Sequence, residues 1–403
     1  MIDVKRRKVV LARGRSKAGW EGEPNLGGWY TEKEIKATVK AIHDSMDWRV
    51  GFGFITREIT DFEKAFARYC GTKYAVSVAT ASIGLDMAMR CLDLKPGDEV
   101  ICPAINFKAS HMAILGQGGK TVLCDVNPRT FNIDVADAER RITRRTRAIL
   151  PVHMNGLSAP MDELLAMARR RSRPGRRIEV IGDAARACGG GYRGGKIGRK
   201  AWMTIFSFHT MKLMTTLGEG GMITTDDPKL ARRLGDMRQW GGGSGWGSSY
   251  KLTKVQAAVG LVQLRRLDSM IARRVRLARL RSRMLEGVPG LALPYEPPDC
   301  VHTFYLYTLL LPRYWAGKKR DEVVRILRKK YGVGCIIANP PVYQDNAFIR
   351  GSIGRQRLPL AEELGARLFC PSLHPLMTDA QNEYIAAAVI EAIERVRGSR
   401  ASR

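Results

Sequence analysis

The sequence predicts an α/β fold in which a mainly parallel sheet is flanked by helices, followed by a smaller C-terminal α/β domain. Short apolar runs rich in β-branched residues alternate with segments of helical periodicity, which is the pattern of such a sheet. The chain has 403 residues, of which 45% are hydrophobic, so it can bury a sizeable core and is too long for one compact unit. We therefore expect one large domain and one smaller domain.

The predicted strands of the large domain are six apolar runs. They are Ala75–Val78, Glu99–Cys102, Thr121–Leu123, Ala148–Val152, Ile178–Ile181 and Met203–Phe206. Helix-like segments such as Ser82–Leu92 and Met161–Arg170 lie between them. Successive strands joined by helices pair in parallel, because the helix carries the chain back to the edge where the previous strand began.

Three units are expected along the chain: a basic, aperiodic N-terminal arm over residues 1–25, the large domain over 26–265, and a linking helix with the small domain over 266–403. Apolar residues from Leu264 to Ala278 recur at spacings of three and four, which predicts a long amphipathic helix whose other face carries most of its arginines. Trp240–Gly247 is expected to be a glycine-rich loop. The remaining expected elements are a strand-like run Phe304–Leu311 and helices Asp321–Lys330 and Asp379–Arg397.

The basic balance of the chain bounds its partners. There are 67 Lys and Arg residues against 39 Asp and Glu, a formal charge of +28, which is enough to attract nucleic acid or anionic surfaces. The basic runs are dispersed and carry no interleaved aromatic residues for stacking on bases. We interpret the charge as a solvated basic surface and expect no specific nucleic-acid partner.

Membrane insertion, secretion and metal binding find no support in the sequence. No stretch reaches the roughly 18 apolar residues of a membrane span, and the N-terminus lacks the apolar core of a secretion signal, so a cytoplasmic protein is expected. The eight cysteines form no C-x-x-C pair and the six histidines no cluster. We expect reduced thiols and no metal site.

Two residues follow predicted buried strands where ligands bind in parallel sheets. Asp183 comes directly after Ile178–Gly182, and Lys212 lies between the strand run Met203–Phe206 and a glycine turn. An aspartate there is often a helix N-cap, and a lone lysine is often a surface residue. Alternatively, desolvation of Lys212 would lower its pKa toward the free amine that Schiff-base chemistry requires. Spacing alone leaves these alternatives open.

Ordered motifs then make the chain recognisable. The segment from Phe62 to Ile393 resembles the DegT/DnrJ/EryC1/StrS family of sugar aminotransferases, which are pyridoxal 5'-phosphate (PLP) enzymes of fold type I. The motifs that carry the resemblance are Asp61–Glu63, Tyr69–Val76, Pro96–Val100, Asp125–Pro128, Pro151–His153, Gly182-Asp183-Ala184-Ala185-Arg186-Ala187, Ser207-Phe208-His209-Thr210-Met211-Lys212, Gly218-Glu219-Gly220-Gly221, Gln256–Leu261 and Pro371-Ser372-Leu373-His374-Pro375.

The resemblance implies a role for each residue of a cofactor site. Lys212 would hold PLP as an imine, and Asp183 would keep the ring nitrogen protonated. Ser207, together with Ala81 and Ser82 at a helix start, would bind the phosphate. Phe107 would stack on the pyridine ring, with an ordinary core phenylalanine as the alternative.

Three departures from the family pattern concern the same site. Arg186 stands where the family commonly has Gln, so a permanent charge would donate to the cofactor's phenolic oxygen. The motif that a partner subunit contributes appears here with Ser249 and Lys251, which are shorter or less forked donors. The segment Ile337–Tyr343 replaces a His-Tyr segment often found near the sugar pocket.

The activity that the resemblance implies is transfer of an amino group from glutamate or glutamine to a keto sugar, often nucleotide-linked, or a keto cyclitol, by a homodimer. A second reading is a sugar dehydratase of the same fold, whose members have His where this chain has Lys212. A third is a regulatory or nucleic-acid-associated relative without catalysis. The retention of both Lys212 and Asp183 favours the aminotransferase.

Overall fold

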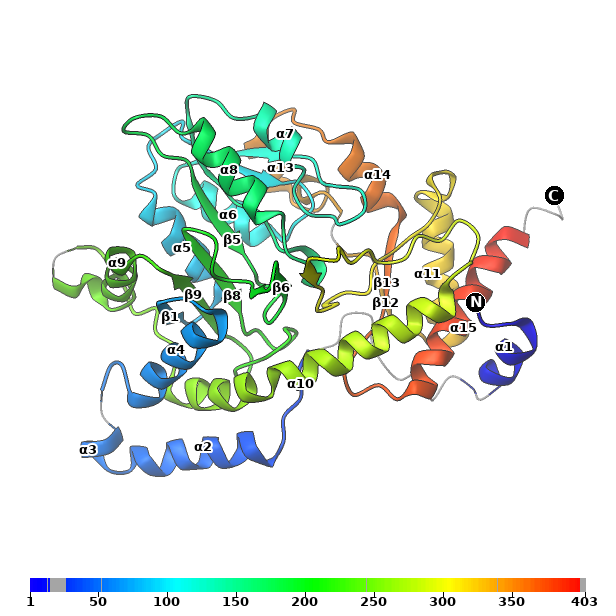
Figure 1. The fold of residues 1–403 in the computed structure, drawn as a ribbon, viewed down its shortest axis with the longest axis horizontal. Coiled ribbons are helices and arrows are strands. Elements are labelled where there is room, and N and C mark those ends of the chain that lie inside the picture. Colours follow the sequence, from blue (N-terminus) through cyan, green and yellow to red (C-terminus); the bar gives the residue numbers. More distant parts are fainter. Residues whose placement is uncertain (13, 15–26, 52, 244, 339, 399–403) are drawn as a thin grey trace.

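The large domain is built on a seven-stranded sheet (Figure 1). The computed structural model describes residues 1–12, 14, 27–51, 53–243, 245–338 and 340–398. The strand order is β1-β9-β8-β5-β4-β2-β3. The strands are β1 (Tyr74–Val78), β2 (Glu99–Pro103), β3 (Lys120–Cys124), β4 (Thr146–Ile149), β5 (Glu179–Asp183), β8 (Met203–Ser207) and β9 (Gly221–Thr225).

The sheet is mainly parallel, as predicted, with one inverted strand. β9 pairs antiparallel with both β1 and β8, whereas β8, β5, β4, β2 and β3 pair in parallel. β9 was not among the predicted strands. It follows β8 through a turn segment without a crossover helix, and such a connection returns the chain antiparallel.

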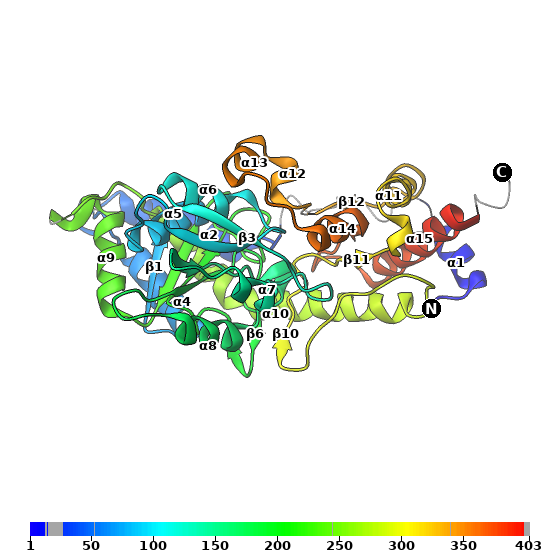
Figure 2. The ribbon, with the colours of Figure 1, turned by 90° about the horizontal axis from the view of Figure 1, so that it is seen from above.

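Helices cover both faces of this sheet (Figure 2). On one face lie α5 (Ala81–Cys91) and α6 (Lys108–Gly116), and on the other α4 (Arg57–Cys70) and α8 (Met161–Arg171). Thr80 starts α5 by accepting a hydrogen bond from the Ile83 backbone at 3.1 Å, as an N-cap does. The sheet also carries α7 (Val135–Arg140) and α9 (Pro228–Arg238).

One long helix, α10 (Lys254–Leu285), runs from the large sheet to the C-terminal part of the chain (Figure 1). A capping box between Thr253 and Gln256 begins it. The C-terminal part contains the sheet β11-β13-β12 (Leu309–Leu310, Leu368–Pro371 and Cys335–Ile336), with helices α11 (Lys318–Tyr331), α12 (Val342–Asp345), α13 (Ala347–Ile353), α14 (Pro359–Arg367) and α15 (Asp379–Gly398). A second small sheet has the order β10-β6-β7 (Cys300–Val301, Gly191–Tyr192, Gly195–Lys196). The expected strand Phe304–Leu311 is strand only at Leu309–Leu310.

The N-terminal arm was predicted to be aperiodic, and for its first residues this is wrong. Val4–Leu11 forms the helix α1, which packs against α15 and buries Val10 and Arg7. The contact with α15 was not predicted because this short helix is mostly polar. Arg7 is nevertheless buried, because it pairs with Glu391 and Glu394. Residues 13 and 15–25 of the expected arm lie outside the described residues.

Most of the arginines of α10 were expected on the polar face of this helix, and two of its arginines lie on the buried face. Arg274 and Arg281 are among the largest fully buried side chains of the described residues. They donate hydrogen bonds to backbone carbonyls and to Asn382 instead of contacting water. The buried face of this helix therefore contains these two arginines beside the apolar residues that predicted it.

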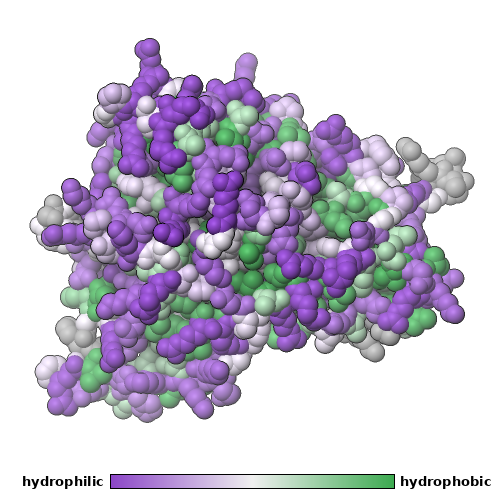
Figure 3. All heavy atoms as spheres, in the orientation of Figure 1, coloured by the Kyte–Doolittle hydropathy of each residue, from purple (hydrophilic) through white to green (hydrophobic). Residues whose placement is uncertain are grey.

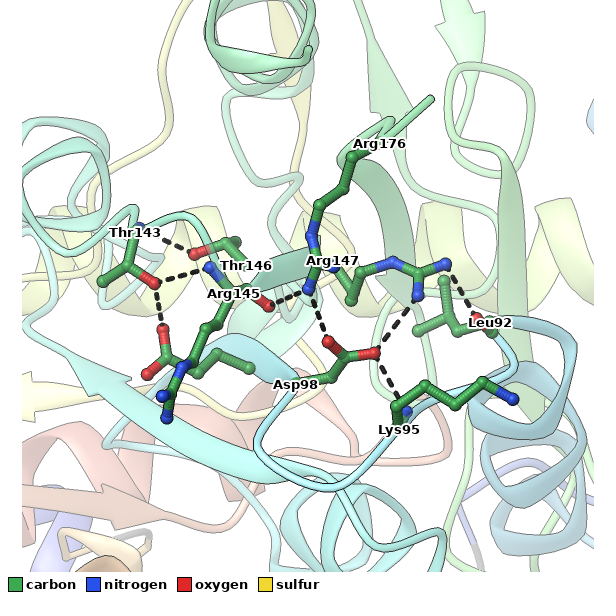
Figure 4. Close-up of polar contacts among 9 residues, drawn as sticks. Leu92, Lys95, Asp98, Thr143, Arg145, Thr146, Arg147 and Arg176 are labelled. Carbon is green, nitrogen blue, oxygen red and sulfur yellow. Dashed lines mark hydrogen bonds and ion pairs between the residues drawn. The ribbon is translucent and has the colours of Figure 1, made fainter. Parts of the chain in front are cut away.

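Arginines of two basic runs, Arg140–Arg147 and Arg169–Arg177, meet at Asp98 (Figure 4). Asp98 precedes β2 and accepts hydrogen bonds from Arg147 and Arg176, and from the Lys95 backbone at 2.9 Å. Arg147 also donates to the Leu92 carbonyl. The face of the molecule seen in Figure 3 is mostly hydrophilic, so many of its charged side chains contact solvent.

Neither a membrane-spanning helix nor a metal-binding cluster occurs in the described part of the chain. No helix of that part of the chain is long and apolar enough to cross a membrane. No group of three or more His, Cys, Asp or Glu side chains there is arranged to hold a metal ion. All eight cysteines are free thiols.

We predict that Asp98→Asn lowers the free energy of unfolding by about 2–3 kcal/mol, because it leaves two arginines facing a buried neutral amide. Burial alone would raise the pKa of Asp98, but the Lys95 amide and Arg176 outweigh it and hold the pKa below its usual value. The stabilisation is therefore present above the unfolded-state pKa of about 4 and is lost as pH falls through the lower folded-state pKa. Urea unfolding of both proteins from pH 7 to pH 2 measures it.

Asp93→Asn is the matched control, since Asp93 pairs with Arg233 on the surface and is worth less than about 1 kcal/mol. Equal losses for the two variants would contradict the account of Asp98.

Candidate active site

Most of the predicted site residues lie at one edge of the large sheet, and Ser249 and Lys251 do not. β5 ends at Asp183 and β8 at Ser207, and the two strands pair in parallel with Asp183 opposite Ile205. α5 begins at Ala81 after β1, and Phe107 follows β2. Because these four strands run in the same direction, their carboxyl ends share the edge where ligands bind in open α/β sheets.

Asp183 is held by hydrogen bonds to both carboxylate oxygens. The Ser110 hydroxyl donates to Oδ2 at 2.7 Å, and the Ala185 backbone N–H donates to Oδ1 at 3.0 Å. The residue is only 4% exposed. Residues 184–190 form turns, so no helix begins here and the N-cap alternative is excluded. Asp183 is a fixed, buried carboxylate at the strand end.

Two buried histidines, His111 and His153, belong to segments that hydrogen-bond to Asp183. The His153 backbone donates to the Asp183 carbonyl at 2.9 Å, and His111 follows Ser110. Burial lowers the pKa of His153 to about 3 and that of His111 to about 4. Both imidazoles are neutral at neutral pH, so neither adds a positive charge beside Asp183.

Lys212 lies half-buried in the turn segment between β8 and β9. Its Nζ donates a hydrogen bond to the Tyr305 hydroxyl at 3.3 Å and lies 4.9 Å from the centroid of that ring. The guanidinium of Arg186, which is buried, lies 5.8 Å from the same centroid. Lys212 and Arg186, predicted from separate motifs, thus come together around one tyrosine, and Lys212 is not an ordinary solvated surface lysine.

Tyr305 was not predicted as a site residue. It lies in the apolar run Phe304–Leu311, which pattern analysis assigned to a strand, and it is 93 residues from Lys212 in the sequence. A tyrosine next to a phenylalanine with a left-handed backbone (Phe304, φ 49°) is a local irregularity, but only the structure reveals it. Sequence offers no signal for this long-range contact.

The start of α5 and the end of β8 form a cradle. Ser207 pairs with Gly221 on β9, and a Cβ added at Gly221 would lie 2.7 Å from the Ala81 nitrogen. Only glycine therefore allows this close approach. The first N–H groups of a helix have no intrahelical acceptor, so those of Ala81 and Ser82 are available for an anion, with the Ser207 hydroxyl nearby. This donor set fits a phosphate group.

Phe107 has a ring that is open to the solvent. It is 54% exposed and precedes α6 as its N-cap residue. The alternative of an ordinary core phenylalanine is therefore wrong. An exposed ring after β2, at the edge that also holds Asp183, is suited to stacking on a flat heterocycle.

Ser249 and Lys251 do not join the group around Lys212. Lys251 donates to the Ser249 hydroxyl at 2.9 Å, and its Nζ lies 3.7 Å from the Trp240 ring centroid. Trp240 packs edge-to-face on Phe54 with ring centroids 5.1 Å apart. The two residues lie beside this exposed pair of aromatic rings.

Comparison with known proteins identifies the family of the chain. The model of the DegT/DnrJ/EryC1/StrS aminotransferase family matches residues 30–390. The chain belongs to this family. The resemblance seen in the sequence motifs is confirmed, and so is the fold class. As a member of the DegT/DnrJ/EryC1/StrS family, the protein is a sugar aminotransferase, and the family depends on PLP.

Individual relatives cover most of both chains. GDP-perosamine synthase of Caulobacter vibrioides is 37% identical over 83% of this chain and 90% of its own length. A Streptomyces venezuelae protein, dTDP-3-amino-3,4,6-trideoxy-alpha-D-glucose transaminase, is 33% identical over 90% and 93%. A Streptococcus pneumoniae protein, solved in PLP and PMP forms, shares the fold with TM-scores of 0.83 and 0.85 at 24% and 23% identity, covering 92% and 94% of this chain and 98% and 99% of that chain.

Proposed function

We propose that the protein transfers an amino group from glutamate or glutamine to the carbonyl of a nucleotide-linked keto sugar, with PLP bound at Lys212 and Asp183. The observation that carries the proposal is the meeting of a buried carboxylate, a half-buried lysine and a helix N-terminus at one sheet edge. A keto cyclitol remains the second substrate class. The presence of lysine at position 212, where the dehydratases of this fold have histidine, supports transamination.

The residues of this chain fit PLP. Asp183 would face the ring nitrogen, Phe107 would stack on the ring, and Ser207 with the Ala81 and Ser82 amides would hold the phosphate. The close approach of Gly221 to Ala81 leaves no room for a side chain at this cradle. Arg186 would donate toward the phenolic oxygen with a permanent charge, where the family commonly has the neutral Gln.

Each residue then has a defined task in amino transfer. When bound, PLP supplies a ring that accepts the electron pair left on the substrate carbon as a proton is removed. Asp183 would keep the ring nitrogen protonated through its negative charge, and hydrogen bonds from Ser110 and Ala185 hold its carboxylate in place. Lys212 would hold PLP, and its amine would accept the proton from the substrate carbon.

The names of the relatives support a nucleotide-linked substrate. One relative's name contains GDP and the other's contains dTDP, and both cover most of their own length in the match. The amino donor rests on the family resemblance alone. A panel of nucleotide-linked keto sugars and keto cyclitols, each tested with glutamate and glutamine, identifies both partners.

A homodimer is part of the proposal. Helix α2 (Glu32–Ser45) packs on α10 with one face and exposes a row of apolar side chains on the other. The row is Ile35, Val39, Ile42 and Met46, each at least 46% exposed. A row at this spacing is one helix face, and burying it against a second copy would remove it from water. Ser249 and Lys251 would reach the phosphate site of the partner.

We predict that Asp183→Asn takes up PLP but transaminates at least about 100-fold more slowly, a rise of about 2.7 kcal/mol in the barrier. The amide keeps the shape of the carboxylate and loses the charge that stabilises the ring proton. Single-turnover rates with the amino donor measure the effect. Asp268→Asn, a surface carboxylate paired with Lys196, is the control and should keep full activity. Near-normal turnover of Asp183→Asn would refute the role.

We predict complementation between subunits. Lys212→Ala subunits mixed in equal amounts with Ser249→Ala/Lys251→Ala subunits should recover about a quarter of the unsubstituted activity, because half of the dimers are mixed and each holds one intact site of two. Activity is assayed after denaturation and joint refolding, with mass spectrometry of intact dimers to verify exchange. Mixed dimers without activity would argue against shared sites.

A further inference from the structure

The contact between Tyr305 and Lys212 assigns a role to a residue outside the predicted site. Tyr305 is 4% exposed, and its hydroxyl accepts the hydrogen bond from Lys212 Nζ. We propose that Tyr305 is a further catalytic residue, which orients the Lys212 amine for proton transfer, and that Arg274 of α10 is the positioning residue that holds the two together. The inference rests on the proposed function of Lys212.

A tyrosine hydroxyl suits this task because it both donates and accepts hydrogen bonds. It accepts a hydrogen bond from Lys212 when the lysine carries a proton, and it donates to the amine lone pair when the lysine does not. The amine therefore stays directed in both protonation states that a proton carrier passes through. The Tyr305 ring, whose centroid lies 4.9 Å from Nζ, also attracts the charged form of Lys212.

Arg274 joins three segments that surround this contact. Its guanidinium donates to the Gly27 carbonyl at 2.9 Å, to the Leu373 carbonyl at 2.8 Å and to the Phe304 carbonyl at 3.5 Å. The Phe304 carbonyl belongs to the peptide group that leads into Tyr305. Arg274 therefore fixes the backbone on the tyrosine side of the contact.

The hydrogen bond from Arg274 to the Gly27 carbonyl connects the arginine to the backbone around Lys212. The Gly27 backbone N–H donates to the Thr210 carbonyl at 2.8 Å. A Cβ added at Gly27 would lie 2.2 Å from the Lys212 carbonyl oxygen, so this glycine is packed directly on the backbone of the lysine. One guanidinium thus links the backbones of both partners, Lys212 through Gly27 and Tyr305 through Phe304.

Arg274 is a buried charged residue, and this positioning role explains why it is buried. Among the described residues, its contacts are carbonyl oxygens, and no carboxylate lies within ion-pair distance. Burial lowers the pKa of Arg274 to about 10, which leaves it protonated at neutral pH. A buried charge without a counterion is costly compared with a packed apolar side chain, so its planar, forked donor geometry is the feature that an apolar residue cannot replace.

The chain offers a matched control for each residue. Tyr307 is buried two positions after Tyr305, and its hydroxyl pairs with Ser282 at 2.8 Å. Arg281 is as buried as Arg274 on the same helix, and it bonds Asn382 at 2.8 Å and the Pro371 carbonyl. Neither control contacts the segments around Lys212 through these bonds.

The test compares Tyr305→Phe with Tyr307→Phe, and Arg274→Lys with Arg281→Lys, each loaded with PLP. Two quantities are measured: the pH midpoint of the PLP absorption band, which reports the environment of the lysine nitrogen without turnover, and the single-turnover rate with the amino donor. Tyr305→Phe should shift the midpoint by about half a unit or more and lower the rate about 10–100-fold, the loss expected for one hydrogen bond to a charged group. Arg274→Lys should change the pH midpoint and the single-turnover rate in the same directions as Tyr305→Phe does.

Tyr307→Phe and Arg281→Lys should leave both quantities unchanged, whatever they do to the melting temperature. Equal midpoints and rates for Tyr305→Phe and Tyr307→Phe would overturn the catalytic role of Tyr305. Equal shifts for the two arginine variants would overturn the positioning role of Arg274. If PLP loads on the unsubstituted protein and transamination proceeds, these results leave the proposed function intact, whereas a protein that gains no PLP band would overturn both.

Discussion

The parallel pairing of β5 with β8 is the constraint on which the candidate site depends. Asp183 lies opposite Ile205, so Ser207 lies two residues further along the neighbouring strand, a distance of about 7 Å. A slip of one residue would turn either side chain to the other face of the sheet. The pairing also sets where the chain leaves β8, and therefore where the turn segment with Lys212 starts.

The second constraint is the long helix α10, which ties the C-terminal part of the chain to the turn segment with Lys212. Arg274 takes its acceptors from Gly27, Phe304 and Leu373, so residues near both ends of the sequence meet at one side chain. Interiors are close-packed and transmit small displacements. The orientation of the Lys212 amine therefore depends on how the C-terminal segments are seated, although the residues that flank it lie on the large sheet.

The sequence predicted what depends on local pattern and on ordered motifs. The parallel strands and the strand-end positions of Asp183 and Ser207 follow from apolar runs, and the structure confirms them. Tyr305 was missed because its partner is 93 residues away and its neighbours look like a strand. The burial of Arg274 and of α1 was not predicted, because a charged residue indicates solvent unless its buried partner is known, and these long-range partners leave no mark in a sequence.

Covalent trapping tests the central claim most directly. The protein is incubated with PLP, reduced with borohydride and digested, and the peptides are mapped by mass spectrometry. The account predicts one modified lysine, Lys212, in the peptide that follows β8, and no modification in Lys212→Ala. Attachment of the reduced cofactor to another lysine, or equal labelling of Lys212→Ala, would contradict the assignment of this strand-end site.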